Sequence, residues 1–385
     1  MGGMKESGVE WIGEIPEEWE IKRLKDCLAI CNGREVESED GSIPVYGSGG
    51  VFKWTDKALC NETSILFGRK GTIDKPLYVE EPFWTVDTMF YSISKGVVDL
   101  HYLYLLATCF KYDYYLSGST LPSMTQTDLG SIYVPFPERT EQRLIAEEAR
   151  MEASSIDKIT DLLVKQIDVL ERYKKSLIHE AVTKGLDPDV AMKPSGVEWI
   201  GDIPEHWKTK RLKYIFQMQS GDNITAEDIE ESGDYPVFGG NGLRGYAEKC
   251  NVHVDSILIG RQGALCGNVH FVQAPFWASD HAIVVYNTTY QSNKYFYYLL
   301  TSMNLNKLSM TAAQPGISVE NVLNQIALLP PLSEQQEIAD YLDEKCAKVD
   351  SILGIKCKQI EVLKKRRQSL IYEYVTGKRR VEGVQ

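Results

Sequence analysis

Two arginines stand between glycines at matching places in the chain, in Gly68-Arg69-Lys70-Gly71 and Gly260-Arg261-Gln262-Gly263. Each follows a short apolar stretch that has the composition of a strand. The flanking glycines permit a tight turn that leaves the arginine projecting. An arginine fork can pair with a guanine edge or a phosphate, while Lys70 suits phosphate and Gln262 suits adenine. The arginine could instead pair with a nearby aspartate and only tie the loop, and the sequence leaves both roles open.

A glycine-rich stretch, Gly240-Asn241-Gly242-Leu243-Arg244-Gly245, matches the GxGxxG fingerprint of dinucleotide-binding proteins. Its counterpart, Gly47-Ser48-Gly49-Gly50-Val51-Phe52, lacks the third glycine. Residues 246–251 do not have the pattern of the helix whose N-terminus would hold the pyrophosphate. We therefore expect a surface loop that approaches DNA closely, with Ser48, Asn241 and Arg244 as candidate contacts.

Two polar segments near the ends of the strand-rich parts, residues 117–123 and 311–318, carry further candidates. Exposed hydroxyl and amide groups on a loop can contact phosphates or base edges. Ser119, Thr120 and Gln314 are accordingly predicted to contact DNA, although a solvated turn explains the same composition equally well.

The overall composition excludes several classes of protein. A net charge of −12 over 385 residues argues against holding DNA by bulk charge. No apolar run approaches the roughly 20 residues of a membrane helix. The eight cysteines form no CxxC pair and the six histidines no HxxxH pair, so we expect reduced thiols, a cytoplasmic location and no metal. Because P-loop, nucleophile-elbow and zinc-protease motifs are also missing, a binding protein without catalytic residues is favoured.

The chain consists of two copies of one plan. Residues 4–25 recur as residues 192–213 with 17 of 22 positions identical, and shorter matching motifs follow in the same order. Each copy has an opening segment with tryptophans, a strand-rich globular part and a helical part. We predict boundaries at 1–138, 139–184, 185–331 and 332–385, and a fold of the α+β class with α/β-type globular domains.

The helical parts have apolar residues at alternating steps of three and four, as in a coiled coil. Helices of about 39 residues would be about 58 Å long, and neither is apolar all round, so each needs a partner. We predict that they pair antiparallel as spacer helices, although burial in an ordinary core is the alternative. The seam residues in the first helix are Ile156, Ile159, Leu163, Leu170 and Leu177. Those in the second helix are Val349, Ile352, Leu363 and Leu370.

Residues 364–380 carry seven basic residues against a single acid, Glu373. This stretch fits either a local basic site in an acidic chain or a solvated helix end.

The motifs Ser-Gly-Val-Glu-Trp-Ile-Gly-x-Ile-Pro, Pro-Pro-Leu-Ser-Glu-Gln-Gln-Glu-Ile-Ala339 and Leu-Ile-x-Glu-x-Val-Thr occur in this order along the chain. In this combination, the chain closely resembles the specificity (S) subunit of type I restriction–modification systems. The resemblance covers essentially the whole chain. It implies two target recognition domains that each read half of a split site in double-stranded DNA, with the spacer helices setting the unread gap.

The resemblance also implies partners. Two methylase (M) subunits would carry S-adenosylmethionine and methylate adenine, and motor–nuclease (R) subunits would use ATP and Mg to cleave DNA. This chain itself would hold no cofactor and would not contact a membrane. Because the chain is acidic, the methylase subunits are expected to supply part of the grip on phosphate.

Two rival hypotheses remain at this stage. One is a nucleotide-dependent enzyme built on residues 240–245, and the other is a structural coiled-coil adaptor without DNA reading. Since residues 70–81 and 262–274 differ, the two globular parts are expected to read different half-sites.

Overall fold

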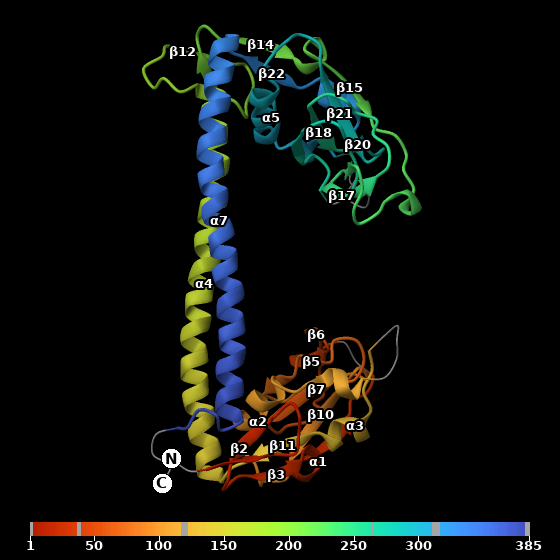
Figure 1. The fold of residues 1–385 in the computed structure, drawn as a ribbon, viewed down its shortest axis with the longest axis vertical. Helices are drawn as coiled ribbons and strands as arrows, with labels where there is room; N and C mark the ends of the chain where they lie inside the picture. The colour runs from red at the N-terminus through yellow and green to blue at the C-terminus, as the bar shows by residue number, and fades with distance from the viewer. Residues whose placement is uncertain (1–2, 37–39, 117–121, 264, 310–315, 382–385) are drawn as a thin grey trace. The chain divides into compact units, whose positions relative to one another are not determined.

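The computed structural model describes residues 3–36, 40–116, 122–263, 265–309 and 316–381. The chain divides into two compact units (Figure 1). Unit 1 comprises Met1–Val164 together with Cys357–Gln385, and unit 2 comprises Lys165–Lys356. Each unit therefore contains one end of both long helices, and the C-terminal end of the chain belongs to unit 1.

Unit 1 is built from short strands and helices that precede the first long helix. Its strands are β1 (Met4–Glu6), β2 (Glu14–Pro16), β3 (Glu20–Arg23), β4 (Leu28–Asn32), β5 (Ile43–Gly47), β6 (Gly50–Thr55), β7 (Ser64–Gly68), β8 (Leu77–Val79), β9 (Trp84–Thr85), β10 (Met89–Ser94) and β11 (Tyr133–Phe136). Its short helices are α1 (Leu24–Cys27), α2 (Leu100–Ala107), the 3₁₀ helix η1 (Tyr112–Tyr115) and α3 (Gln126–Ser131).

Unit 2 repeats this order. Its strands are β12 (Met192–Pro194), β13 (Asp202–Pro204), β14 (Lys208–Arg211), β15 (Phe216–Ser220), β16 (Tyr235–Gly239), β17 (Gly242–Ala247), β18 (Ser256–Gly260), β19 (Val269–Val272), β20 (Trp277–Ala278), β21 (Ala282–Asn287) and β22 (Ile326–Leu329). Its helices are η2 (Leu212–Tyr214), η3 (Ala226–Asp228), α5 (Asn293–Ser302), η4 (Leu305–Leu308) and α6 (Val319–Leu323).

The sheets of the two units have the same topology. Unit 1 has a four-stranded sheet in the order β4-β10-β7-β8 and a three-stranded sheet in the order β6-β5-β9, and unit 2 has β15-β21-β18-β19 and β17-β16-β20. The pairs β11–β3 and β14–β22 also correspond. Duplicated sequence therefore produces duplicated structure, and the predicted mixed fold with a long helix pair is confirmed.

Two long helices, α4 (Arg139–Lys184) and α7 (Leu332–Val375), pair antiparallel. In unit 2, Lys174 contacts Asp350 at 2.6 Å, and Lys356 Nζ donates to Gln166 Oε1 at 2.6 Å. One residue number falls as its partner's rises, which is the mark of an antiparallel pair. In unit 1 the same arrangement brings Arg367 Nε to 2.8 Å from Asp157 Oδ1.

The seam of this pair differs from the predicted one at two equivalent positions. Ile159 is 49% exposed and Ile352 is 43% exposed, so both lie outside the seam. The half-buried residues are instead their neighbours Thr160 and Leu353. In α4 the seam position is a threonine, Thr160, so apolar character pointed to the neighbouring Ile159. In α7, Ile352 and Leu353 are both apolar, so apolar character does not distinguish them. The other predicted residues are buried or half-buried: Ile156, Leu163, Leu170, Leu177, Val349, Leu363 and Leu370.

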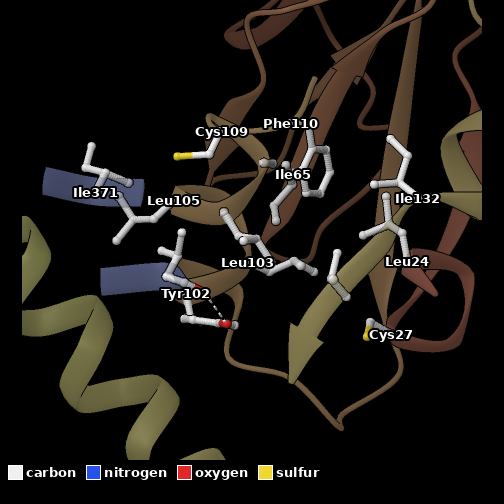
Figure 2. Packing of buried hydrophobic residues seen from close by; sticks show 14 of the residues in the cluster. Leu24, Cys27, Ile65, Tyr102, Leu103, Leu105, Cys109, Phe110, Ile132 and Ile371 are labelled. Atoms are coloured by element: carbon white, nitrogen blue, oxygen red, sulfur yellow. Dashed lines mark hydrogen bonds between the residues drawn. The ribbon is translucent and has the colours of Figure 1, made fainter. Parts of the chain in front are cut away.

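Each unit has one main core that includes one end of both long helices. In unit 1, Tyr102 on α2 is fully buried, and its hydroxyl donates to the carbonyl oxygens of Pro135 (3.0 Å) and Val375 (3.1 Å). Figure 2 shows Ile371 of α7 beside Leu105 of α2 in this core. In unit 2, the hydroxyl of Tyr295 makes the corresponding bonds to Leu328 and Val182. Tertiary packing thus joins each long helix to a globular part.

Candidate nucleic-acid interface

The two arginine loops are held by the same backbone bonds in both units. After the buried strand β7, the amide of Arg69 donates to Thr88 O (2.8 Å), and its carbonyl accepts from Met124 N (3.0 Å). After β18, Arg261 bonds in the same way to His281 O (2.8 Å) and Ile317 N (2.9 Å). Each arginine therefore lies on a rigid loop at the end of a buried strand.

The arginine side chains also reach equivalent partners. Nη1 of Arg69 donates to the carbonyl oxygen of Asp87 at 3.2 Å, and Nη1 of Arg261 donates to that of Asp280 at 3.3 Å. Each bond uses one of five guanidinium N–H donors. Lys70 is exposed and lies 3.7 Å from the Asp87 carboxylate. These bonds to backbone carbonyls hold the arginine loops in place, whereas the alternative expected an ion pair with an aspartate. Both arginines stay half-exposed with further donors on the guanidinium.

The glycine-rich turns lie against the arginine loops. A Cβ placed on Gly71 would lie 3.8 Å from Oγ of Ser48 in the β5–β6 turn. In unit 2, a Cβ on Gly260 would lie 2.3 Å from the carbonyl oxygen of Gly240, so the two backbones approach as closely as glycine permits. Asn241, beside Gly240, is exposed. The structure therefore brings together Ser48, Arg69 and Lys70 in unit 1, and Asn241, Arg261 and Gln262 in unit 2.

The GxGxxG stretch is a hairpin and not a nucleotide site. Gly242–Ala247 is strand β17, antiparallel to β16, where a dinucleotide site needs a helix. Arg244 is an exposed residue of this strand.

The third pair of predicted segments is only partly described. Ser119, Thr120 and Gln314 lie outside the described residues. The described ends of these segments join the arginine loops, through the bridges Lys70↔Ser123 and Gln262↔Gly316. All three predicted loop regions thus meet at one edge of each unit.

One histidine lies under the turn in unit 2. His270 on β19 is within 4 Å of a Cβ placed on Gly242, and its Nε2 is buried without a hydrogen-bond partner in the described part of the chain. Burial lowers the pKa of His270, which favours the neutral ring. His270 therefore adds no positive charge to the surface at neutral pH.

Sequence reasoning missed an exposed apolar strip on β6. Val51, Phe52 and Trp54 are 44%, 53% and 52% exposed, directly beside the turn with Ser48. Exposed aromatic side chains gathered on one strand mark an interaction surface. The sequence could have indicated this exposed strip, because apolar residues directly follow Gly49-Gly50. Residues so close to a turn do not reach the core.

The sequence matches the type I restriction modification DNA specificity domain twice, over residues 16–172 and 204–364. The chain belongs to this family. Its relatives include the EcoprrI specificity subunit of Escherichia coli, 40% identical over 152 residues, a match that covers 38% of each chain. The MjaVIII specificity subunit of Methanocaldococcus jannaschii is 26% identical over 418 residues, covering 96% of this chain and 95% of the relative.

The family also matches in fold. A solved chain from work on complex assembly and conformational transition of the type I R-M system superposes with a TM-score of 0.68 at 13% identity, over 94% of this chain and 98% of that one. Within the described residues, no helix is both long and apolar enough to cross a membrane, and no group of three His, Cys, Asp or Glu side chains is placed to hold a metal ion.

Proposed function

We propose that this chain is the DNA-reading subunit of a type I restriction–modification complex, in which each unit recognises one half of a split target. The observation that carries the proposal is the duplicated edge, where three loop regions meet around Arg69 in unit 1 and around Arg261 in unit 2. Both edges lie on rigid sheets, as base reading requires.

The two edges share a backbone and differ in side chains. Lys70 stands where unit 2 has Gln262, and in the turns Ser48 stands where unit 2 has Gly240, and Gly49 where unit 2 has Asn241. Lysine serves phosphate or guanine, whereas glutamine can pair with adenine N6 and N7. The two edges have the same backbone arrangement and different side chains, which supports the proposal that the two half-sites have unrelated sequences.

Arg69 and Arg261 are proposed to bind DNA in the same way, each at the half-site of its own unit. An arginine held by one bond to a carbonyl can direct its remaining donors to guanine or phosphate. A good bidentate pair contributes about 1–3 kcal/mol of discrimination.

Partner subunits are proposed to supply the chemistry. Two methylase subunits with S-adenosylmethionine would modify adenine, and motor–nuclease subunits with ATP and Mg would cleave. This chain would be non-catalytic, hold no cofactor itself and act in the cytoplasm. The net charge of −12 supports a division of labour in which the methylases provide much of the contact with phosphate.

The long helices are proposed to act as the spacer that fixes the number of unread base pairs. Helices α4 and α7 each contribute residues to both units.

The test is to co-express the chain with its cognate methylase and to map methylated adenines across the genome. A split motif with two unrelated halves is the expected result. A contiguous motif would overturn the two-part proposal, and no methylation from a stable complex would favour the adaptor alternative.

A further inference from the structure

We propose that one residue at the hairpin bulge of each unit selects a base in that unit's half-site: Phe52 by apolar contact with a thymine methyl group, and Arg244 by pairing with guanine. This inference rests on the proposed function and extends it to particular residues and base edges.

The bulges occupy equivalent places. In unit 1, Tyr46 pairs with Val51 and Val45 with Lys53, which leaves Phe52 as the extra residue of β6. In unit 2, Phe238 pairs with Leu243 and Val237 with Gly245, which leaves Arg244 as the extra residue. A bulge twists a strand and redirects the side chain of its extra residue.

The side chain of the extra residue in each bulge lies over a glycine next to the turn. A Cβ on Gly47 would lie 3.2 Å from Cε1 of Phe52 and 4.0 Å from Cγ2 of Val86. A Cβ on Gly239 would lie 2.6 Å from Cδ of Arg244 and 3.6 Å from Oγ of Ser279. The two glycines thus form equivalent platforms for an aromatic ring and for an arginine stem.

The residue behind each platform matches the residue that crosses it. Val86 gives unit 1 an apolar backing for the ring. Ser279 is fully buried, and its Oγ has no hydrogen-bond partner among the residues that the structure describes. The backing of the platform is thus apolar in unit 1 and polar in unit 2.

DNA is the occupant that the surroundings favour. Val86 and Ser279 directly precede Asp87 and Asp280, whose carbonyls bind the two loop arginines. The bulges are therefore continuous with the proposed reading edges, and Lys53 lies 6.0 Å from the Phe52 ring centroid. An apolar strip with a cation beside it suits a base edge next to a phosphate.

The chemistry of the two side chains determines what they can distinguish. Phenylalanine cannot donate or accept a hydrogen bond, so the thymine methyl group is the feature of the major groove that it can prefer. Arginine has a planar fork that matches O6 and N7 of guanine. Unit 1 is thus assigned an apolar determinant and unit 2 a hydrogen-bonding one.

The experiment uses the complex of this chain with its methylase and duplexes that carry the target found by methylation mapping. Each thymine of the unit 1 half-site is replaced in turn by deoxyuridine, which lacks the methyl group. At one position we expect about fourfold weaker binding, the effect of one buried methyl group. Phe52→Ala should bind the two duplexes equally well.

The arm for unit 2 replaces guanine by 7-deazaguanine, which lacks N7. One position should weaken wild-type binding about tenfold, and Arg244→Ala should remove that difference. Val97→Ala is the matched control, because Val97 is 45% exposed and follows the end of β10 remote from Met89 and the arginine loop. It should keep both differences.

The inference is overturned if no thymine of the unit 1 half-site is sensitive to loss of its methyl group, or if Phe52→Ala keeps that sensitivity. A split wild-type motif with either result leaves the proposed function standing. A wild-type complex without a split motif contradicts the proposed function itself. Since Phe52 is exposed, Phe52→Ala should fold, which thermal unfolding checks.

Discussion

Unit 2 is formed by one continuous stretch of chain, whereas unit 1 depends on a segment from the far end of the sequence. In both units a buried tyrosine of the globular part donates a hydrogen bond to a long helix. The acceptor is the carbonyl of Val182 in unit 2 and of Val375 in unit 1. The same fold can therefore be completed by a helix segment that is adjacent in sequence or by one that is distant. Two units with the same fold can thus respond differently to a deletion.

The recognition edges show the opposite relation. There the backbone bonds are the same and the side chains differ, with Lys70 against Gln262 and Phe52 against Arg244. The backbone of the edge determines where a side chain lies. The chemical type of that side chain determines which base or phosphate it can bind.

The largest expected effect comes from removing residues 366–385. This deletion takes five buried residues from the core of unit 1: Leu370, Ile371, Tyr374, Val375 and Val381. Each large-to-small core change costs about 2–5 kcal/mol, so the loss of all five costs about 10–25 kcal/mol, as much as or more than the roughly 5–15 kcal/mol that stabilises a domain. Hydrogen exchange should show loss of protection at residues 100–107 and retained protection in unit 2. Equal protection of both units would show that unit 1 is complete without the segment.

A milder form of this test compares two single changes in α7. Ile371→Ala should destabilise unit 1 by about 2–5 kcal/mol, whereas Val362→Ala, at a position 62% exposed, should have little effect. Equal effects would show that the core contact of Ile371 is not important.

The next largest effect is on DNA binding. Arg69→Ala should cost about 1–3 kcal/mol on the half-site of unit 1 only, and Arg261→Ala the same on the other half. Binding of the methylase complex to duplexes with one altered half measures this. Arg139→Ala, whose side chain binds the carbonyl of Gly96, is the control. The division into two readers fails if both loop arginines act on the same half.

The helix pair should respond weakly and equally in both units. Lys174 pairs with Asp350 in unit 2, and Arg367 pairs with Asp157 in unit 1. These partly exposed pairs are expected to contribute about 0.2–1 kcal/mol each in double-mutant cycles of thermal unfolding. Arg172→Ala, which breaks only a pair within α4, is the matched control. A coupling of several kcal/mol in either unit would contradict this expectation.

The smallest effect concerns two glutamates that accept from tryptophans, Glu141, which is buried, and Glu334, which is half-buried. Trp19 donates to Glu141 at 3.0 Å, and Trp207 donates to Glu334, which also contacts His206. Burial raises the pKa of Glu141 above its ordinary value, so folding favours its protonated form. Unit 1 should gain stability as pH falls through the raised pKa, and the gain is complete below the ordinary value.

Glu141→Gln keeps an acceptor for Trp19 and removes the titration. The variant should resemble wild type at neutral pH and lose the gain in thermal stability on acidification to pH 4.5 or below. An unchanged pH dependence would show that Glu141 does not carry it.

The sequence predicted the repeated plan because identical motifs recur 188 residues apart, and it predicted the long helix pair because the period persists over many turns. It misplaced Ile159 because a polar residue, Thr160, occupies the seam in α4, and it misplaced Ile352 because its neighbour Leu353 is equally apolar. The apolar pattern locates the buried face of a helix only approximately where the partner helix packs against a small polar residue.

Two features depend on contacts that sequence patterns do not contain. The basic residues near the C-terminus bind unit 1: Lys378 donates to Ile12 O, Arg379 pairs with Glu152, and Arg380 pairs with Glu18. Neither predicted role for them, a local basic site or a solvated helix end, included these partners. Phe52 was overlooked because its exposure follows from a bulge that only strand pairing reveals.

The central claim is that each unit reads its own half of the target through the loop regions that meet at its edge, which lie within residues 43–123 and 235–318. The most direct test replaces residues 43–123 by residues 235–318 and maps the methylated motif of the resulting complex. The account predicts that both halves of the new motif match the half previously read by unit 2. An unchanged motif, or a change in the half read by unit 2, would contradict it.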